Sequence, residues 1–318
     1  MALVLGIDTS NYTTSCALYD SQRNELFQLK MLLPVKLGEC GIRQSDAVFH
    51  HTRQLPNLIS QLFALAQGRT IDAVCVSATP RRQEGSYMPC FTVGMCVAQS
   101  IASAMNIPCF DVSHQQGHIS AALYSADKLS QTCERFLAFH VSGGTTEAIL
   151  VSPDDKDIIS CEIVGKTLDL NAGQLIDRVG VMLGLQFPCG KELESLAVNY
   201  TKPIKVRPVL KGTDCCLSGF ENKLSDIYNK TSDKELTCAT TLAYVEATVS
   251  AMTQSILDKF GQMPVVYAGG VMSDAIIRDK LKLKFNADFA APEFSCDNAA
   301  GVAVLGAMKL ERINNLSV

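Results

Sequence analysis

The pattern that most restricts the fold is a strand, a short polar turn and a returning strand, which occurs twice in the chain. The first copy spans residues 2–19 with its turn at residues 8–11, and the second spans residues 135–152 with its turn at residues 142–146. Each copy is followed by segments in which helical and strand patterns alternate. Such alternation is typical of α/β lobes that contain parallel sheet. The repetition therefore predicts two related α/β lobes.

The remaining segments fill in these lobes. Apolar spacing and turn residues predict strands at 71–77, 108–112 and 264–268, and helices at 52–66, 92–105, 172–183, 245–260, 274–285 and 298–310. We expect an N-terminal lobe at residues 1–125 and a C-terminal lobe at 126–318, with a cleft lined by loop tips between them. Residues 202–233 are the least regular, and an inserted helical or loop subdomain is predicted at about residues 185–235.

Composition limits the partners that the chain can bind. Hydrophobic residues make up 47% and charged residues 19%, which suits a large core and excludes disorder. The net charge of −4 gives no global basic field, so a nucleic acid must meet a local patch. Tryptophan is absent, which argues against surfaces that stack bases.

Cysteine usage and the N-terminus indicate the compartment. The 13 cysteines are odd in number, contain no Cys-x-x-Cys pair and often lie in apolar runs. We therefore expect reduced thiols rather than disulfides. The N-terminal apolar run is short and predicts a strand, not a signal peptide, and no segment is long enough for a membrane span. These features predict a soluble, cytoplasmic protein without membrane contact.

Two of the chain's five histidines, His114 and His118, are four residues apart. At this spacing, both rings lie on one face of a helix and can reach one metal ion. The spacing alone leaves open whether they are ligands or two helix histidines without a metal.

Three turns combine glycine with hydroxyl residues, at residues 6–10, 142–146 and 269–273. Glycine lets the backbone approach an anion, and exposed amides in a turn can bind phosphate. Together the three turns predict a nucleotide cleft, although each could be an ordinary tight turn.

Asp297 precedes an alanine-rich segment that is predicted to be helical. A carboxylate there commonly caps the helix. It could equally complete a His/His/carboxylate metal set. Sequence spacing does not decide between these roles.

The order and spacing of these motifs resemble the TsaD/Gcp/YgjD family, which contains tRNA threonylcarbamoyladenosine synthase subunits formerly called O-sialoglycoprotein endopeptidases. The matching segments run nearly end to end and include residues 6–10 (GIDTS), 114–118 (HQQGH), 141–144 (VSGG), 166–169 (KTLD), 217–219 (LSG), 268–271 (AGGV) and 296–300 (CDNAA). The resemblance implies a two-lobe actin/hexokinase-like (ASKHA) ATPase fold.

The resemblance also implies site residues and partners. His114, His118 and Asp297 match the family's ligands for one divalent metal ion per subunit, iron or zinc. Positions expected to bind an adenylate or ATP-type nucleotide are Val141, Ser142, Gly143, Gly144, Thr145, Asp177, Gly190, Gly269, Gly270 and Asp274. The implied partners are threonylcarbamoyl-AMP, tRNA, a related TsaB-like subunit and a TsaE-like ATPase.

Several loops depart from the family pattern. The usual Gly-Pro-Gly loop is replaced by the longer polar segment 79–87, and Thr145 replaces a histidine. Gln174 replaces a glutamate and Asp274 an asparagine. These changes predict a divergent member in which the metal set is retained while the substrate loops have changed.

Three functions follow from these observations. The leading hypothesis is metal-dependent transfer of threonylcarbamoyl from threonylcarbamoyl-AMP to N6 of the adenosine next to the tRNA anticodon. No nucleophilic side-chain arrangement is visible, so direct attack by the exocyclic amine is expected. The alternative is a nucleotide- and metal-binding paralogue with a regulatory or scaffolding role. A metallopeptidase is least favoured, because Gln115 stands where a His-Glu-x-x-His motif has its general base.

Overall fold

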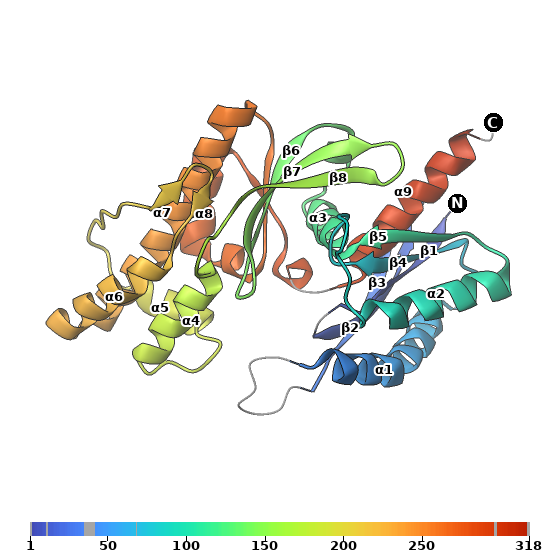
Figure 1. The fold of residues 1–318 in the computed structure, drawn as a ribbon, viewed down its shortest axis with the longest axis horizontal. Coiled ribbons are helices and arrows are strands. Elements are labelled where there is room, and N and C mark those ends of the chain that lie inside the picture. The colour runs from blue at the N-terminus through green and yellow to red at the C-terminus, as the bar shows by residue number, and fades with distance from the viewer. Residues whose placement is uncertain (1, 11, 35–41, 68, 296–297, 317–318) are drawn as a thin grey trace. The chain divides into compact units, whose positions relative to one another are not determined.

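The computed structural model divides the chain into two compact units (Figure 1). It describes residues 2–10, 12–34, 42–67, 69–295 and 298–316. Unit 1 contains Met1–Cys133, Ser152–Cys161 and Cys296–Val318, and unit 2 contains Glu134–Val151 and Glu162–Ser295. Both units are discontinuous in sequence. The lobes expected at residues 1–125 and 126–318, and the insertion at 185–235, stay a prediction.

Unit 1 is built on a five-stranded sheet with the strand order β3-β2-β1-β4-β5. The strands are β1 (Leu3–Asp8), β2 (Thr13–Asp20), β3 (Glu25–Leu32), β4 (Ala73–Thr79) and β5 (Cys109–Ser113). β1, β2 and β3 are antiparallel neighbours, whereas β4 pairs parallel to β1 and β5 parallel to β4. The first predicted strand–turn–strand unit is thus present as β1 and β2.

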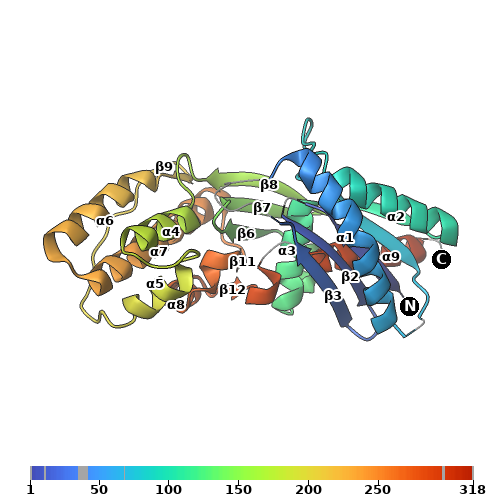
Figure 2. The same cartoon turned by 90° about the horizontal axis from the view of Figure 1, so that it is seen from below.

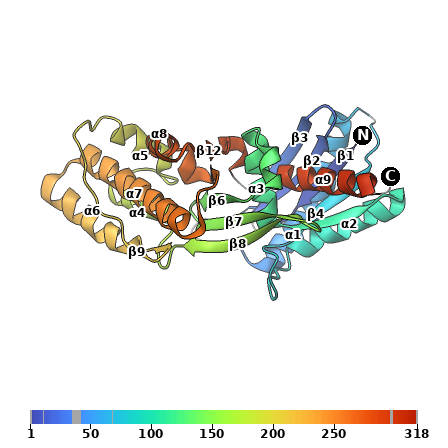
Figure 3. The ribbon, with the colours of Figure 1, turned by 90° about the horizontal axis from the view of Figure 1, so that it is seen from above.

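Helices pack on both faces of this sheet, because successive side chains of β1 point to opposite faces. α1 (Gln44–Leu65) and α2 (Phe91–Met105) share a core with Leu5 and Ile7 of β1, and Figure 2 shows α1 crossing the sheet. On the other face, α9 (Ala300–Leu316) packs against β1. α3 (His114–Ser125) packs in turn on α9 (Figure 3). A 3-10 helix, η1 (Leu129–Cys133), ends the first segment.

The contact between α3 and α9 depends on glycine. A Cβ atom at Gly301 of α9 would overlap the carbonyl oxygen of Gly117 and lie 2.5 Å from the Ala121 nitrogen of α3. The contact of β1 with the start of α9 is equally close, because a Cβ atom at Gly6 of β1 would lie 2.6 Å from the oxygen of Ala299, the residue before α9. Backbone atoms cannot move aside as a flexible side chain can. α3, which carries both candidate metal histidines, is therefore positioned by direct backbone contact with α9.

Unit 2 is built on a second five-stranded sheet with the order β12-β11-β6-β7-β8. The strands are β6 (Phe136–Val141), β7 (Thr146–Asp154), β8 (Ile158–Lys166), β11 (Val265–Ala268) and β12 (Asp288–Phe289). β6 and β7 are antiparallel, and β11 pairs parallel to β6 and β12. The second predicted strand–turn–strand unit is thus present as β6 and β7.

The helices of unit 2 contribute to a core that includes Phe139 and Tyr267, whose ring centroids are 5.1 Å apart. They are α4 (Ala172–Met182), α5 (Gly190–Ala197), α6 (Ser218–Thr231), α7 (Lys234–Phe260) and α8 (Ala275–Phe285). Shorter elements are β9 (Leu210–Lys211), β10 (Asp214–Cys215), η2 (Gly270–Ser273) and η3 (Pro292–Phe294). The irregular segment 185–235 thus contains helices and one short hairpin.

The described cysteines are all free thiols, as the sequence predicts. Burial raises the pKa of Cys16 and Cys75 to about 12, so both act as packing residues rather than nucleophiles. Within the part of the chain that the structure describes, no helix is both long and apolar enough to cross a membrane.

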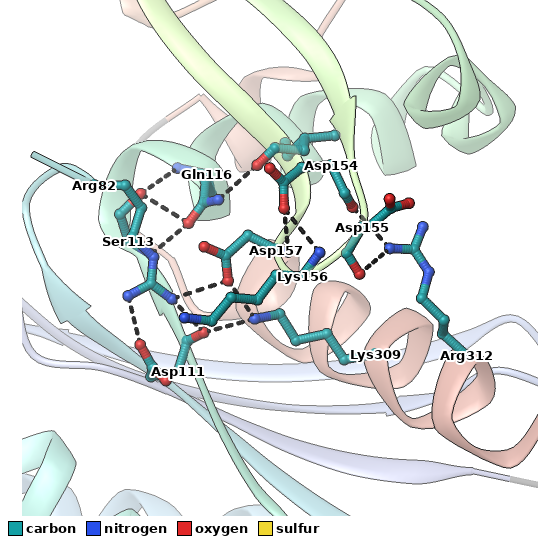
Figure 4. A network of polar contacts seen from close by, with 11 residues as sticks. Arg82, Asp111, Ser113, Gln116, Asp154, Asp155, Lys156, Asp157, Lys309 and Arg312 are labelled. Atoms are coloured by element: carbon teal, nitrogen blue, oxygen red, sulfur yellow. Dashed lines mark hydrogen bonds and ion pairs between the residues drawn. The ribbon is translucent and has the colours of Figure 1, made fainter. Parts of the chain in front are cut away.

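The tip of the β7–β8 hairpin belongs to unit 1 and is held there by three basic side chains (Figure 4). Lys309 Nζ lies 2.7 Å and an Arg82 terminal nitrogen 3.3 Å from the same oxygen of Asp157. Arg312 donates to two carbonyl oxygens of the tip, those of Asp154 and Asp155. Arg82 comes from the divergent segment 79–87, so this segment helps to anchor the hairpin.

Replacing Lys309 with methionine should lower the free energy of unfolding by about 1–3 kcal/mol, measured by urea denaturation. The Lys309 side chain is only 10% exposed. Without its ammonium group, the Asp157 carboxylate keeps its ion pair with Arg82 but loses the closer one. The matched control is Lys280→Met, because Lys280 is 54% exposed and 4.0 Å from Glu246. A surface pair of this kind should contribute less than about 0.5 kcal/mol. Equal losses in the two variants would contradict this account.

Candidate functional site

His114 and His118 lie on the first turns of α3, and their Nε2 atoms are 2.9 Å apart. The helix begins at His114 because Ser113 and Gln116 form a capping box, in which each side chain bonds the other's backbone nitrogen. Gln115 N donates to the Pro80 carbonyl at the start of segment 79–87. The predicted helical face is therefore real, and it directs both imidazoles at one point.

Asp8 lies beside this pair, although it is not among the metal-site residues predicted from the sequence. Its Oδ2 atom is 2.8 Å from Nδ1 of His114, and its side chain is 1% exposed. Its Oδ1 atom accepts a hydrogen bond of 2.7 Å from Ser10 N. Asp8 ends β1 at the polar turn, and the acidic residue in that turn is the signal that could have suggested a role.

The chemistry of these donors fits a divalent metal ion. Two imidazole nitrogens of one helix approach each other, and the far nitrogen of His114 contacts a buried carboxylate. Metal-binding histidines commonly have such a carboxylate partner. Asp297, the third expected ligand, lies outside the described residues. Among the residues described, no group of three or more potential ligands is placed to hold a metal.

In unit 2, four of the expected nucleotide positions, residues 142–145, form the turn between β6 and β7, and a fifth, Val141, ends β6. Ser142 N donates to the Thr145 oxygen at 2.7 Å, and Ser142 Oγ accepts from Gly144 N at 3.3 Å and Thr145 N at 3.2 Å. Gly143 and Gly144 are exposed, and nothing lies within 4 Å of a Cβ atom built on either. The two long bonds to Ser142 Oγ could be exchanged for bonds to a phosphate.

Two other segments pack closely on this turn. A Cβ atom at Gly173, in the first turn of α4, would lie 2.6 Å from Gly143 N. A Cβ atom at Gly269 would overlap the carbonyl oxygen of Val141, and the φ of Gly269 is +101°. The structure therefore brings together the turn, the α4 N-terminus and the Gly269–Gly270 loop.

Asp177 lies one turn further along α4, and its Oδ1 accepts a 2.9 Å hydrogen bond from Cys189 N. This bond fixes the residue immediately before Gly190, the first residue of α5. Two expected nucleotide positions, Asp177 and Gly190, are thus neighbours in unit 2.

Asp274 caps α8 and is 8% exposed, with its Oδ1 accepting from Ile277 N at 3.0 Å. Burial, with a further contribution from the Glu194 carboxylate, raises the pKa of Asp274 from 3.8 to about 6. The carboxyl group that replaces the family's asparagine is therefore in an environment that disfavours its charged form.

The Asp274→Asn variant should unfold at higher temperature than the parent protein at pH 7.5 but not at pH 4. The pKa of Asp274 is higher in the folded protein than in the unfolded chain, so the free energy of unfolding of the parent protein falls as the pH rises from about 4 to 6. Asparagine retains the cap without the charge, and the gain should be about 1–3 kcal/mol at 1.36 kcal/mol per pKa unit. Asp233→Asn, at the cap of α7, is the control and should show no such gain. A pH-independent difference would contradict the account.

Three solved structures share this architecture over nearly the whole chain. The first is component A of the (R)-2-hydroxyglutaryl-CoA dehydratase of Acidaminococcus fermentans, with 15% identity, a TM-score of 0.54 and coverage of 98% of this chain and 100% of that chain. The second is the activator of the 2-hydroxyisocaproyl-CoA dehydratase of Clostridium difficile with bound ADPNP (12%, TM-score 0.52, coverage 99% and 98%). The third is a ROK family glucokinase of Streptomyces griseus in complex with glucose and AMPPNP (8%, TM-score 0.52, coverage 96% and 99%).

With its two mixed sheets and flanking helices, the chain has an actin/hexokinase-like ATPase fold, which confirms the predicted class. The model of the TsaD family, tRNA N6-adenosine threonylcarbamoyltransferase, matches residues 35–304. The chain therefore belongs to the TsaD family, and its general function is that of a transferase in tRNA modification.

Proposed function

We propose that this protein transfers the threonylcarbamoyl group of threonylcarbamoyl-AMP to N6 of the adenosine adjacent to the tRNA anticodon. The observation that carries the proposal is the family match over residues 35–304, which includes both histidines and the β6–β7 turn. The N6 amine forms a bond to the carbamoyl carbon, the bond from that carbon to the phosphate oxygen breaks, AMP leaves and N6 loses a proton. The reaction is an acyl transfer, with no covalent enzyme intermediate.

We propose that His114, His118 and Asp297 hold one divalent ion, iron or zinc. Support comes from the 2.9 Å approach of the two Nε2 atoms and from the buried carboxylate behind His114. A metal in such a site supplies Lewis acidity to a carbonyl oxygen. The protein's own part is to hold the two imidazoles on one face of α3.

The adenylate is proposed to bind in unit 2. Val141, Ser142, Gly143, Gly144 and Thr145 supply the phosphate-binding turn, and Asp177 and Asp274 are the ribose-binding carboxylates. Gly190, Gly269 and Gly270 allow close approach of the backbone. The exposed glycines of the turn and its tight packing on α4 support this assignment. Two proteins of similar fold were solved with the ATP analogues ADPNP and AMPPNP.

Transfer to tRNA requires that the protein bind a polyanion. With a net charge of −4, the chain has no global basic field for this task. We therefore propose that tRNA binding in the cytoplasm depends on a TsaB-like subunit, and that a TsaE-like ATPase assists turnover.

A second function, a nucleotide-binding scaffold without transfer, is supported by one observation. Gln174, which replaces a family glutamate, accepts a 3.1 Å hydrogen bond from Asn171 N and so completes the capping box of α4. Its side chain therefore has a structural use that needs no substrate. Calorimetry with threonylcarbamoyl-AMP, paired with a turnover assay, separates the two functions. Binding without turnover supports the scaffold, and binding with transfer supports the enzyme.

Deleting the gene in a strain that lacks every other copy should remove threonylcarbamoyladenosine from tRNA, measured by mass spectrometry of digested nucleosides. The wild-type gene should restore it, and a His118→Ala gene should not. Unchanged tRNA in the deletion strain would contradict the proposed reaction.

A further inference from the structure

We propose that Asp8 is a positioning residue that fixes the tautomer and orientation of His114, so that the His114 Nε2 lone pair is available to a metal. The proposal rests on the metal site proposed above. It adds a residue from a strand that lies 106 positions away from His114 in the sequence.

The geometry gives the two oxygens of Asp8 separate partners. Oδ2 contacts His114 Nδ1 at 2.8 Å, while Oδ1 accepts from Ser10 N at 2.7 Å. The side chain is 1% exposed, so water does not compete for either oxygen. The polar turn after β1 thus orients a carboxylate toward α3. This role does not require the turn to bind the phosphate that the sequence pattern of residues 6–10 predicts.

An ionised carboxylate only accepts hydrogen bonds, so its partner Nδ1 must carry the hydrogen. A neutral imidazole with its hydrogen on Nδ1 has its lone pair on Nε2, the atom that faces His118. Asp8 therefore selects the tautomer that a metal needs. It also restrains rotation of the ring, because the helix backbone holds one end and the carboxylate the other.

A purely structural role for Asp8 would act through the Ser10 bond alone. Such a role predicts a loss of stability in Asp8 variants, with no effect on the protonation of His114. The tautomer of His114 is therefore the decisive readout.

The first experiment is long-range ¹H–¹⁵N NMR of the metal-free protein with ¹⁵N-labelled histidine, in which the His114 signals are assigned with a His114→Gln variant. In the unsubstituted protein, His114 should carry its hydrogen on Nδ1. A hydrogen on Nε2 would overturn the proposal, and this result does not require an Asp8 variant to fold. In Asp8→Asn, the amide can donate to Nδ1, so the hydrogen should move to Nε2.

The second experiment titrates Co²⁺ into the same proteins and follows the visible absorption of the bound ion. Asp8→Asn should bind Co²⁺ about 10–100-fold more weakly than the unsubstituted protein. The control is Asp72→Asn, because Asp72 Oδ2 also accepts from an amide of β1, Leu3 N, but contacts neither histidine. The control should keep the parent affinity.

Equal Co²⁺ affinity in Asp8→Asn and the parent, or equal weakening in Asp72→Asn, would overturn the role of Asp8. Failure of the unsubstituted protein to bind Co²⁺ would instead contradict the proposed metal site. The NMR result then still decides whether Asp8 sets the tautomer, so the two failures are distinguishable.

Discussion

The His118→Ala variant is expected to bind its divalent metal about 10²–10³-fold more weakly. Zinc binds to a four-ligand site with a free energy of about 10–16 kcal/mol, and the expected loss corresponds to roughly one quarter of it. His118 supplies one of the two Nε2 atoms that approach within 2.9 Å. Isothermal titration with Zn²⁺ measures the affinity, and AMP release from threonylcarbamoyl-AMP in the presence of tRNA measures the reaction. Both should fall together, because the proposed transfer depends on the ion.

The matched control is His50→Ala. His50 lies on α1 of the same unit, is partly exposed like His118, and contacts Phe49 rather than the histidine pair. This variant should keep the metal affinity and the activity of the parent protein. If His118→Ala bound metal as tightly as His50→Ala, the ion would be held elsewhere and the site would be wrong.

The Gly301→Ala variant should lose about 3 kcal/mol or more of folding free energy, because the added methyl group meets backbone atoms on α3. The added Cβ atom would overlap the Gly117 carbonyl oxygen and lie 2.5 Å from Ala121 N. At roughly 2–4 °C per kcal/mol, the melting temperature should fall by about 10 °C. Any protein that still folds must move α3 away from α9, so its metal affinity should fall as well.

Gly219→Ala is the control for this substitution. Gly219 also lies in a helix, α6, but nothing is found within 4 Å of a Cβ atom built on it. Alanine there should leave stability unchanged or raise it by up to about 1 kcal/mol. Similar losses in both variants would show that helix propensity, rather than the α3–α9 contact, sets the effect.

The sequence predicted the strands best where apolar residues are continuous, and it misplaced some helices. The helix expected at residues 52–66 begins at Gln44, because Ala47 and His51 continue its buried face. His51 breaks the apolar pattern, yet it is fully buried and lies 2.7 Å from Thr14 Oγ1. A buried polar residue whose hydrogen-bond partner lies on a strand far away in the sequence cannot be recognised as buried from its sequence neighbours.

The helix expected at residues 245–260 also begins earlier, at Lys234. Its first half is rich in threonine, which disfavours helix by propensity. Thr237, Thr240 and Thr241 each donate to the carbonyl oxygen four residues before, so their hydroxyl groups are satisfied inside the helix. Tertiary burial then outweighs the local preference.

The candidate site was predictable only in part. Helical spacing was enough to place His114 and His118 on one face, since their separation is local. Asp8 joins them only in the folded chain, where β1 and α3 both pack against α9. Residue spacing cannot predict a contact between residues 106 positions apart. For the same reason, residue spacing could not predict that Gly173 and Gly269 pack against the segment 141–143.

The most direct test of the proposed reaction is a single-turnover assay with metal-loaded protein, threonylcarbamoyl-AMP and unmodified tRNA, with the related subunit and ATPase added. Released AMP and modified nucleoside are counted in the same sample. We predict equal amounts of the two products, and neither when Zn²⁺ or iron is removed. AMP without modified nucleoside, or no AMP despite bound threonylcarbamoyl-AMP, would contradict transfer.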